Sequence, residues 1–137
     1  MMPKRNLAQR VGFWFVFFWF LIGGVAHFAA TQTEMKIVPA YIPSPHAAVL
    51  VSGAFELLGA FGLLLRQTRR AAGWGLFALT IAVTPANVYM LQRSELFNIP
   101  YWVLVIRLPI QLALLALILW STTGADRGVS QLGNRDR

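Results

Sequence analysis

A long apolar run over residues 47–65 carries a single carboxylate, Glu56, near its middle. A run of about twenty apolar residues is long enough to cross a bilayer as a helix. A carboxylate within such a helix is costly and rarely faces lipid, so it usually faces a partner or a hydrated cavity. Ser52 and Ala60 share the helical face of Glu56, and Gly53 and Gly59 flank that face. The run therefore predicts a membrane helix whose small, polar face lets other helices approach closely.

Three further apolar runs make this helix one of four. The predicted spans cover residues 11–30, 46–65, 71–91 and 99–120. Hydrophobic residues make up 57% of the 137-residue chain and charged residues 12%, which is about half the charged fraction of a soluble domain. Short connections between the spans favour alternating directions. We therefore predict an all-α fold, an integral membrane antiparallel four-helix bundle, formed as one domain by residues 11–120.

The first span resembles a secretory signal peptide in one respect, because a basic segment precedes it. The apolar core of a signal peptide covers about 7–15 residues and ends at a small-x-small cleavage site. Here the apolar run is longer, and Phe28 occupies the position two before Ala30. We expect an uncleaved transmembrane helix.

The formal net charge of +7 is unevenly distributed along the chain. Basic residues concentrate in residues 1–10, in the turn at 66–70 and in the polar tail at 121–137, whereas the two other connections hold only Lys36 and Arg93. Such residues at segment ends, without interleaved aromatics along one surface, argue against nucleic acid as a partner. By the positive-inside rule, both termini lie in the cytoplasm.

The chain contains no cysteine, which excludes disulfides, thiolate metal sites and iron–sulfur clusters. Its two histidines, His27 and His46, make a weak haem site because His46 directly follows Pro45 at a helix start. No hydrolytic nucleophile–base set is visible in the sequence. We therefore predict no metal site and assign no catalytic residue, and whether the protein is an enzyme stays open.

The connection over residues 31–45 contains prolines that prevent a continuous helix. It is nevertheless rich in apolar residues, which a solvated loop does not need. One interpretation is a lid over the mouth of the bundle, with Pro39, Tyr41 and Pro43 as its lid residues. The other is an interfacial anchor without a functional role.

A polar stripe runs along the third span through Thr80, Thr84 and Asn87. Pro85 interrupts the backbone hydrogen bonds beside it and is expected to kink the helix. The threonine and asparagine side chains can then satisfy the freed carbonyls or bond across helices. We favour this structural role for the two threonines.

Each of the four spans brings a polar side chain to the outer half of the bundle. At ~1.5 Å per residue, His27 and Asn87 lie roughly 5 Å below the outer ends, Arg107 about 12 Å, Glu56 about 15 Å and Gln111 about 18 Å. Glu56 and Arg107 are expected to pair, and the other three supply further hydrogen bonds. Two interpretations stay open: an ion pair that fixes helix register, and a small site for a polar head group or a proton.

The pattern resembles the DoxX-like family of small bacterial four-helix membrane proteins. The residues that carry the resemblance lie in all four spans and in the proline-containing loop: Gly24–Phe28, Ile37–Pro39, Tyr41–Pro43, Ser52–Glu56, Gly59, Thr68–Arg70, Pro85–Asn87 and Arg107–Gln111. The resemblance implies a multi-pass protein of the bacterial inner membrane. It also implies a link to quinone-dependent oxidoreductases, such as thiosulfate:quinone oxidoreductase, or to oxidative-stress complexes.

These expectations define two candidate functions. In the first, the protein is a membrane subunit or accessory of a quinone-linked redox system and binds a small amphipathic ligand, with a quinone as the implied cofactor. Arg107, His27 and Asn87 would donate hydrogen bonds to a carbonyl head, and Glu56 would handle protons. In the second, it is a non-catalytic membrane anchor or interaction protein for a soluble redox partner. Besides the lipid bilayer, the partners considered are a soluble or membrane oxidoreductase and a second copy of the chain. A minimal carrier is disfavoured because no inverted repeat is evident.

Overall fold

Helices account for nearly all of the regular structure in the computed structural model, which describes residues 5–123. Residues 1–4 of the predicted basic segment and 124–137 of the predicted tail lie outside the described residues. The elements, in chain order, are α1 (Leu7–Ala29), α2 (Thr31–Met35), α3 (Pro45–Leu64), α4 (Arg69–Ala82), α5 (Thr84–Gln92), the short 3-10 helix η1 (Ser94–Leu96) and α6 (Tyr101–Thr123). The predicted all-α fold is confirmed.

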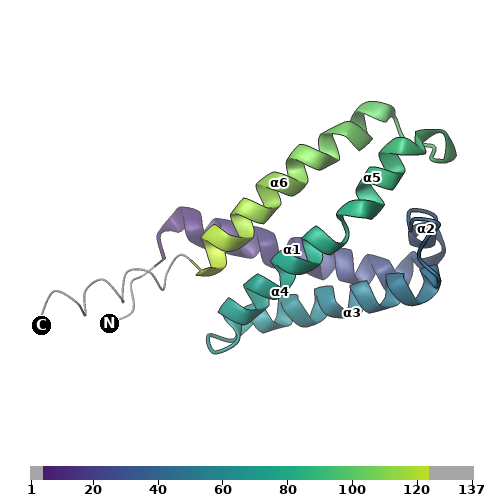
Figure 1. Ribbon diagram of the computed structural model, residues 1–137. Helices are drawn as coiled ribbons and strands as arrows, with labels where there is room; N and C mark the ends of the chain where they lie inside the picture. Colours follow the sequence, from purple (N-terminus) through teal and green to yellow (C-terminus); the bar gives the residue numbers. More distant parts are fainter. Residues whose placement is uncertain (1–4, 124–137) are drawn as a thin grey trace, which may run out of the picture.

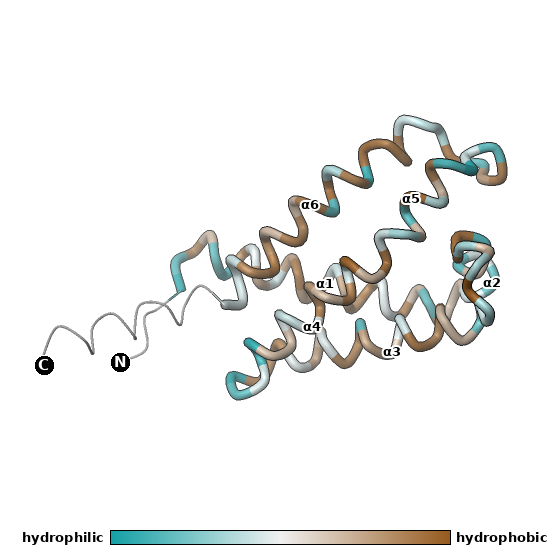
Figure 2. Tube along the Cα trace, viewed as in Figure 1, coloured by the Kyte–Doolittle hydropathy of each residue, from teal (hydrophilic) through white to brown (hydrophobic). Residues whose placement is uncertain are grey.

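Four helical segments are long and apolar enough to cross a membrane. They are α1, α3, the combined segment α4–α5 (Arg69–Gln92) and α6. Figure 2 shows hydrophobic residues along these segments and hydrophilic residues gathered at the α3–α4 turn and the α5–α6 connection. The chain is therefore a multi-pass membrane protein with four candidate spans, packed as a helix bundle.

The four segments form a ring in which α1 lies between α3 and α6, and α4 also lies between α3 and α6 (Figure 1). The start of α1, the α3–α4 turn and the end of α6 share one end of the bundle, which we call the basic end. The short helix α2 and the α5–α6 connection lie at the other, which we call the α2 end. Directions alternate around the ring, so the predicted antiparallel arrangement is present.

The apolar core occupies the half of the bundle nearer the basic end. Its buried side chains come from α1, α3, α4 and α6 and include Val16, Phe20, Leu63, Leu76 and Ile118. Large apolar side chains also point outward from the long helices, as expected where the surroundings are lipid. Toward the α2 end the two pairs of helices diverge (Figure 1), so the tight core does not extend through the whole bundle.

Local sequence signals set where the first two long helices begin. Asn6 accepts a hydrogen bond from the Gln9 backbone at 2.8 Å, and the Gln9 side chain accepts one from the Asn6 backbone at 3.2 Å. This capping box starts α1 at Leu7, four residues before the predicted span. Ser44 caps α3, and Pro45 occupies its first turn, where the missing N–H has no cost.

Helices α1 and α3 approach closely at two glycines. A Cβ atom built on Gly53 would lie 2.6 Å from the Cβ atom of His27 and 3.2 Å from the carbonyl oxygen of Gly24. A Cβ atom on Gly24 would lie 2.8 Å from Leu57. Small residues on both helices are thus required for this backbone approach, which also brings His27 over α3.

The third span is broken in its middle. Helix α4 ends at Ala82 and α5 begins at Thr84, with Pro85 in the first turn of α5, so the predicted interruption is present. The Thr84 hydroxyl donates to the Thr80 carbonyl at 3.2 Å, and the Thr80 hydroxyl donates to the Leu76 carbonyl at 2.7 Å. After the break, α5 packs against α6 and diverges from α1 and α3 (Figure 1).

Candidate functional site

A cavity of about 760 Å³ lies where the helices diverge. Its lining comes from α1, α3, α4, α5 and α6 and from α2 with the loop that follows it. Most of the lining is apolar, and its polar side chains fall into two sets on different walls. The apolar part suits a hydrocarbon body, and the polar sets suit a head group.

The first polar set joins α1, α2 and α3 and consists of His27, Glu34 and Glu56. His27 Nε2 lies 3.3 Å from Glu56 Oε1, and His27 Nδ1 lies 3.8 Å from Glu34 Oε2. The side chains of His27 and Glu56 are only 17% and 12% exposed. The close glycine crossing of α1 and α3 places His27 against Glu56, so the packing of two helices builds this pair.

The second polar set joins α4, α5 and α6. Arg107 Nη2 donates to Asn87 Oδ1 at 3.2 Å, and Asn87 Nδ2 donates to Gln111 Oε1. Gln111 Nε2 in turn donates to the Thr80 carbonyl at 2.9 Å and contacts the Thr84 hydroxyl. Gln111 thus satisfies a carbonyl next to the break between α4 and α5, as expected for polar side chains beside a proline in a membrane helix.

The predicted ion pair between Glu56 and Arg107 is absent. Glu56 pairs with His27, and the side-chain partner of Arg107 is Asn87. Over residues 5–123, no carboxylate oxygen lies within 4.0 Å of the Arg107 guanidinium. The reason is the order of the helices: α3 and α6 face each other across the ring, whereas α3 is a direct neighbour of α1.

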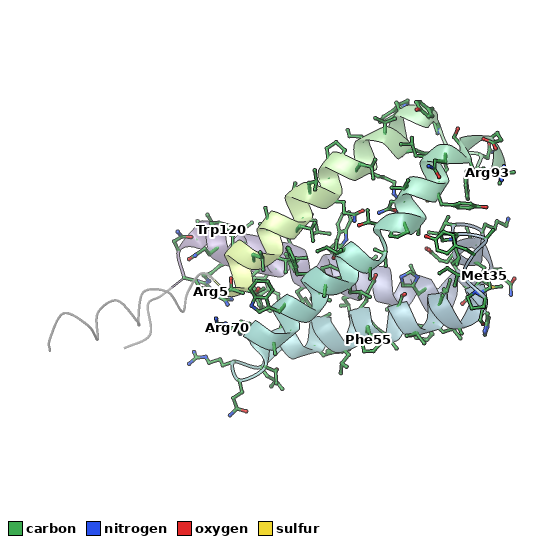
Figure 3. The ribbon with its side chains drawn as sticks, viewed as in Figure 1. Arg5, Met35, Phe55, Arg70, Arg93 and Trp120 are labelled. Atoms are coloured by element: carbon green, nitrogen blue, oxygen red, sulfur yellow. The ribbon has the colours of Figure 1, made fainter. Side chains whose placement is uncertain are left out.

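All five predicted site residues line this same cavity: His27, Glu56, Asn87, Arg107 and Gln111. The structure brings them together as two sets rather than one. Their role in binding a ligand or a proton stays a prediction. Figure 3 shows side chains in the space between the two helix pairs.

The predicted lid residues differ in their placement. Pro39 is buried and lines the cavity, and Tyr41 lines it while remaining 72% exposed. Pro43 is exposed, and the cavity lining does not include it. Ile37, Val38 and Ile42 also line the cavity, so the loop forms part of the cavity wall. Its role as a lid stays a prediction.

Glu34 is the site residue that the sequence pattern missed. It lies on α2, a five-residue helix in a segment predicted to be irregular. The Thr31 hydroxyl donates to the His27 carbonyl at 2.7 Å and ties the start of α2 to the end of α1. His27 and Glu34 are seven residues apart, which is about two helical turns. This spacing is the feature of the sequence that could have predicted that the two side chains lie close together.

The two polar sets differ in the chemistry that they offer. One wall carries two carboxylates around an imidazole, and the other carries a guanidinium with amides. Together they can hold a head group by hydrogen bonds from both sides, or transfer a proton between carboxylate and imidazole. The part of the chain over residues 5–123 holds no group of three or more His, Asp or Glu side chains placed for a metal ion.

The fold and the site together define a small multi-pass membrane protein. Its four-helix bundle contains a mostly apolar cavity that carries two sets of polar side chains. The chain belongs to the family described as a domain of unknown function (DUF8561), which it matches over residues 17–123. That match includes every residue that lines the cavity. It does not show the DoxX-like family, and that resemblance stays a prediction. No curated protein and no solved structure matches the chain.

Proposed function

We propose that this protein binds a small amphipathic ligand in the cavity and serves a quinone-linked redox system as a membrane subunit or accessory. The cavity has an apolar lining that suits a hydrocarbon body and two polar sets that suit a head group. The DoxX-like resemblance supports a quinone as the ligand. The family of unknown function to which the chain belongs leaves the ligand class open.

The state of Arg107 is the observation that carries this proposal. A charged arginine within a membrane helix costs about 2.5–3.5 kcal/mol on insertion scales. Here the guanidinium has no carboxylate within 4.0 Å among residues 5–123, and its side-chain partner is one amide oxygen. Its remaining N–H groups are available to a carbonyl or anionic oxygen of a ligand, which would offset part of this cost.

The other polar set fits the same ligand from the opposite wall. His27 can donate to a second oxygen of the head group, and Glu56 can accept or supply a proton there. A quinone head has carbonyl oxygens at both ends of one ring, so in this proposal each oxygen meets one set.

We also propose the orientation of the protein in the membrane. The basic end carries Arg66, Arg69 and Arg70 in and after the α3–α4 turn, and Figure 3 shows Arg5 and Arg70 at this end, away from Met35 and Arg93. The positive-inside rule then places the basic end and both termini in the cytoplasm of a bacterial cell. The cavity would open toward the outer side of the inner membrane.

The second candidate function, an anchor for a soluble redox partner, draws on the same basic end. A concentration of arginines on the cytoplasmic side could hold an acidic protein by charge complementarity. This function needs no ligand in the cavity.

Mass spectrometry of small molecules retained after gentle detergent purification tests the first function against the second. We expect a stoichiometric quinone with the unchanged protein and loss of the quinone with Arg107→Gln. Arg93→Gln is the matched control, because Arg93 pairs with Glu95 at 3.9 Å outside the cavity. A co-purifying soluble protein with an empty cavity would support the anchor and contradict the ligand.

A further inference from the structure

Glu56, His27 and Glu34 form a line of side chains that leads from the cavity toward its mouth. The two carboxylates approach different nitrogens of the same imidazole. Glu56 lies 3.3 Å from Nε2, and Glu34 lies 3.8 Å from Nδ1. A proton that enters one ring nitrogen can therefore leave from the other.

The two carboxylates at the ends of this line differ in solvent exposure, and this difference indicates which end faces water. The Glu56 side chain is 12% exposed and the Glu34 side chain 26%. Glu56 lies within the long helix α3, whereas Glu34 lies on α2 at the open end of the bundle (Figure 1). Glu34 is therefore the group that exchanges protons with water most readily.

His27 Nδ1 is buried and has no hydrogen-bond partner among residues 5–123. A buried ring nitrogen without a partner is costly, and Glu34 Oε2 is the acceptor that lies close to it. At 3.8 Å this contact is about 0.6–1.2 Å longer than a hydrogen bond, a gap of the size that active-site contacts often close when the site is occupied. A small shift of the Glu34 side chain, or of α2 toward the end of α1, would close the gap.

We propose that Glu56, His27 and Glu34 form a proton path between the cavity and its outer mouth, with Glu34 as the exit. In the transfer step, Nε2 of a neutral His27 accepts the proton of the Glu56 carboxyl while Nδ1–H gives its proton to the Glu34 carboxylate. The O–H bond at Glu56 and the N–H bond at Nδ1 break, and an N–H bond at Nε2 and an O–H bond at Glu34 form.

One negative charge thus moves from Glu34 to Glu56. Glu34 then releases its proton to water. The starting arrangement returns when Glu56 takes up a new proton from the cavity and His27 exchanges protons with water, gaining one at Nδ1 and losing the one at Nε2.

The path is separate from the second polar set. The other ionisable side chains on the cavity lining are Tyr41, from the loop, and Arg107, from α6. Arg107 bonds to Asn87 on α5 rather than to any member of the path. The path goes beyond the ligand proposed above and operates without it, so it can be tested on the empty protein.

Exchange of the His27 ring proton with water tests the path. The chain has two histidines, so His46→Gln leaves His27 as the one signal in protein labelled with ¹⁵N-histidine. Magnetisation transfer from water then measures the exchange rate in this parent and in variants added to it. We expect Glu34→Gln to slow exchange at least about tenfold, because the proton acceptor at the mouth is lost.

Two controls make the result specific. Glu95→Gln removes a carboxylate of the same end that lies outside the cavity, and it should leave the rate within about twofold of the parent. Glu34→Asp keeps a shorter carboxylate and should give an intermediate rate.

An unchanged rate in Glu34→Gln would overturn the proposal. Equal slowing by Glu95→Gln and Glu34→Gln would also overturn it, because the effect would then come from the loss of a negative charge at this end of the bundle and not from the path. Either result would leave the ligand proposal standing, since ligand retention is measured separately.

Discussion

His27 is the side chain through which three elements of the site interact. Its Nε2 is hydrogen-bonded to Glu56 from α3, and its Nδ1 lies beside Glu34 from α2. Buried polar groups that interact directly are coupled in stability, whereas groups that merely line the same cavity are coupled weakly. The pairing seen in the structure therefore predicts which substitutions interact.

A double-mutant cycle measures this coupling by thermal unfolding in detergent. His27→Gln and Glu56→Gln should each cost about 1–3 kcal/mol, and their combination should differ from the sum by about 0.5–3 kcal/mol. Glu56→Gln combined with Arg107→Gln should be additive within about 0.5 kcal/mol, because these two side chains do not meet. Strong coupling in the second cycle and none in the first would contradict the observed pairing.

Gln111 is predicted to stabilise the break in the third span. Its side chain is buried and bonds to the Thr80 carbonyl and the Asn87 side chain. Gln111→Leu would remove one of the two side-chain hydrogen bonds to the Thr80 carbonyl and leave Asn87 Nδ2 without its acceptor, so it should destabilise the protein by about 1–3 kcal/mol. Gln67→Leu changes an exposed glutamine in the α3–α4 turn and should stay within about 0.5 kcal/mol. Equal stability of the two variants would argue against the hydrogen bonds at the break.

For individual residues, the sequence predicted the five side chains that line the cavity but not all of the contacts between them. The spacing along each helix gives depth, and all five predicted residues do line the cavity. Depth alone does not say which helices are neighbours, so Glu56 was paired with Arg107 instead of His27. Glu34 was missed because its helix has five residues, too few for a periodic pattern.

The crossing of α1 and α3 is the contact between elements on which the first polar set depends. Gly53→Ala would place a Cβ atom 2.6 Å from the Cβ atom of His27, which cannot move without shifting α1. We expect a loss of about 1–3 kcal/mol in unfolding free energy. Gly75→Ala is the control, since a Cβ atom there meets nothing within 4 Å, and it should be neutral or slightly stabilising. A neutral Gly53→Ala would show that the two helices are farther apart than in the structure.

Proline chemistry made one feature of the elements predictable. Pro85 lacks a backbone N–H, and the break between α4 and α5 falls beside it. The start of α1 was placed four residues late because the polar residues before Val11 hide a capping box that extends the helix. Polar residues at a helix end can belong to the helix even when they do not belong to the apolar span.

The whole molecule is predicted to have one orientation in the membrane. Because the chain lacks cysteine, Thr33→Cys at the α2 end and Gln67→Cys at the basic end can be labelled individually. Both positions are exposed. An impermeant thiol reagent added to intact cells should label the first and spare the second, because the arginines hold the basic end inside. The opposite pattern would reverse the orientation and the outward opening of the cavity.

The fold class followed from four apolar runs, because a chain within a bilayer must satisfy its backbone internally and helices do so. The divergence of the helices toward the α2 end could not be predicted from any single apolar run. It arises from the combination of a tight crossing of α1 and α3 with a broken third span that packs on α6. Such a combination depends on which helices are adjacent, and that order is a property of the folded molecule.

Protection of one cavity position by a quinone tests the central claim most directly. Ser52→Cys places a thiol in the cavity, and Val51→Cys places one on the outward face of the same helix at the same depth. Both would be labelled with methyl methanethiosulfonate in detergent, with and without the short-chain quinone decylubiquinone. We predict that the quinone slows labelling of Ser52→Cys at least about tenfold and leaves Val51→Cys within about twofold. Equal labelling of Ser52→Cys with and without the quinone would contradict a quinone in the cavity.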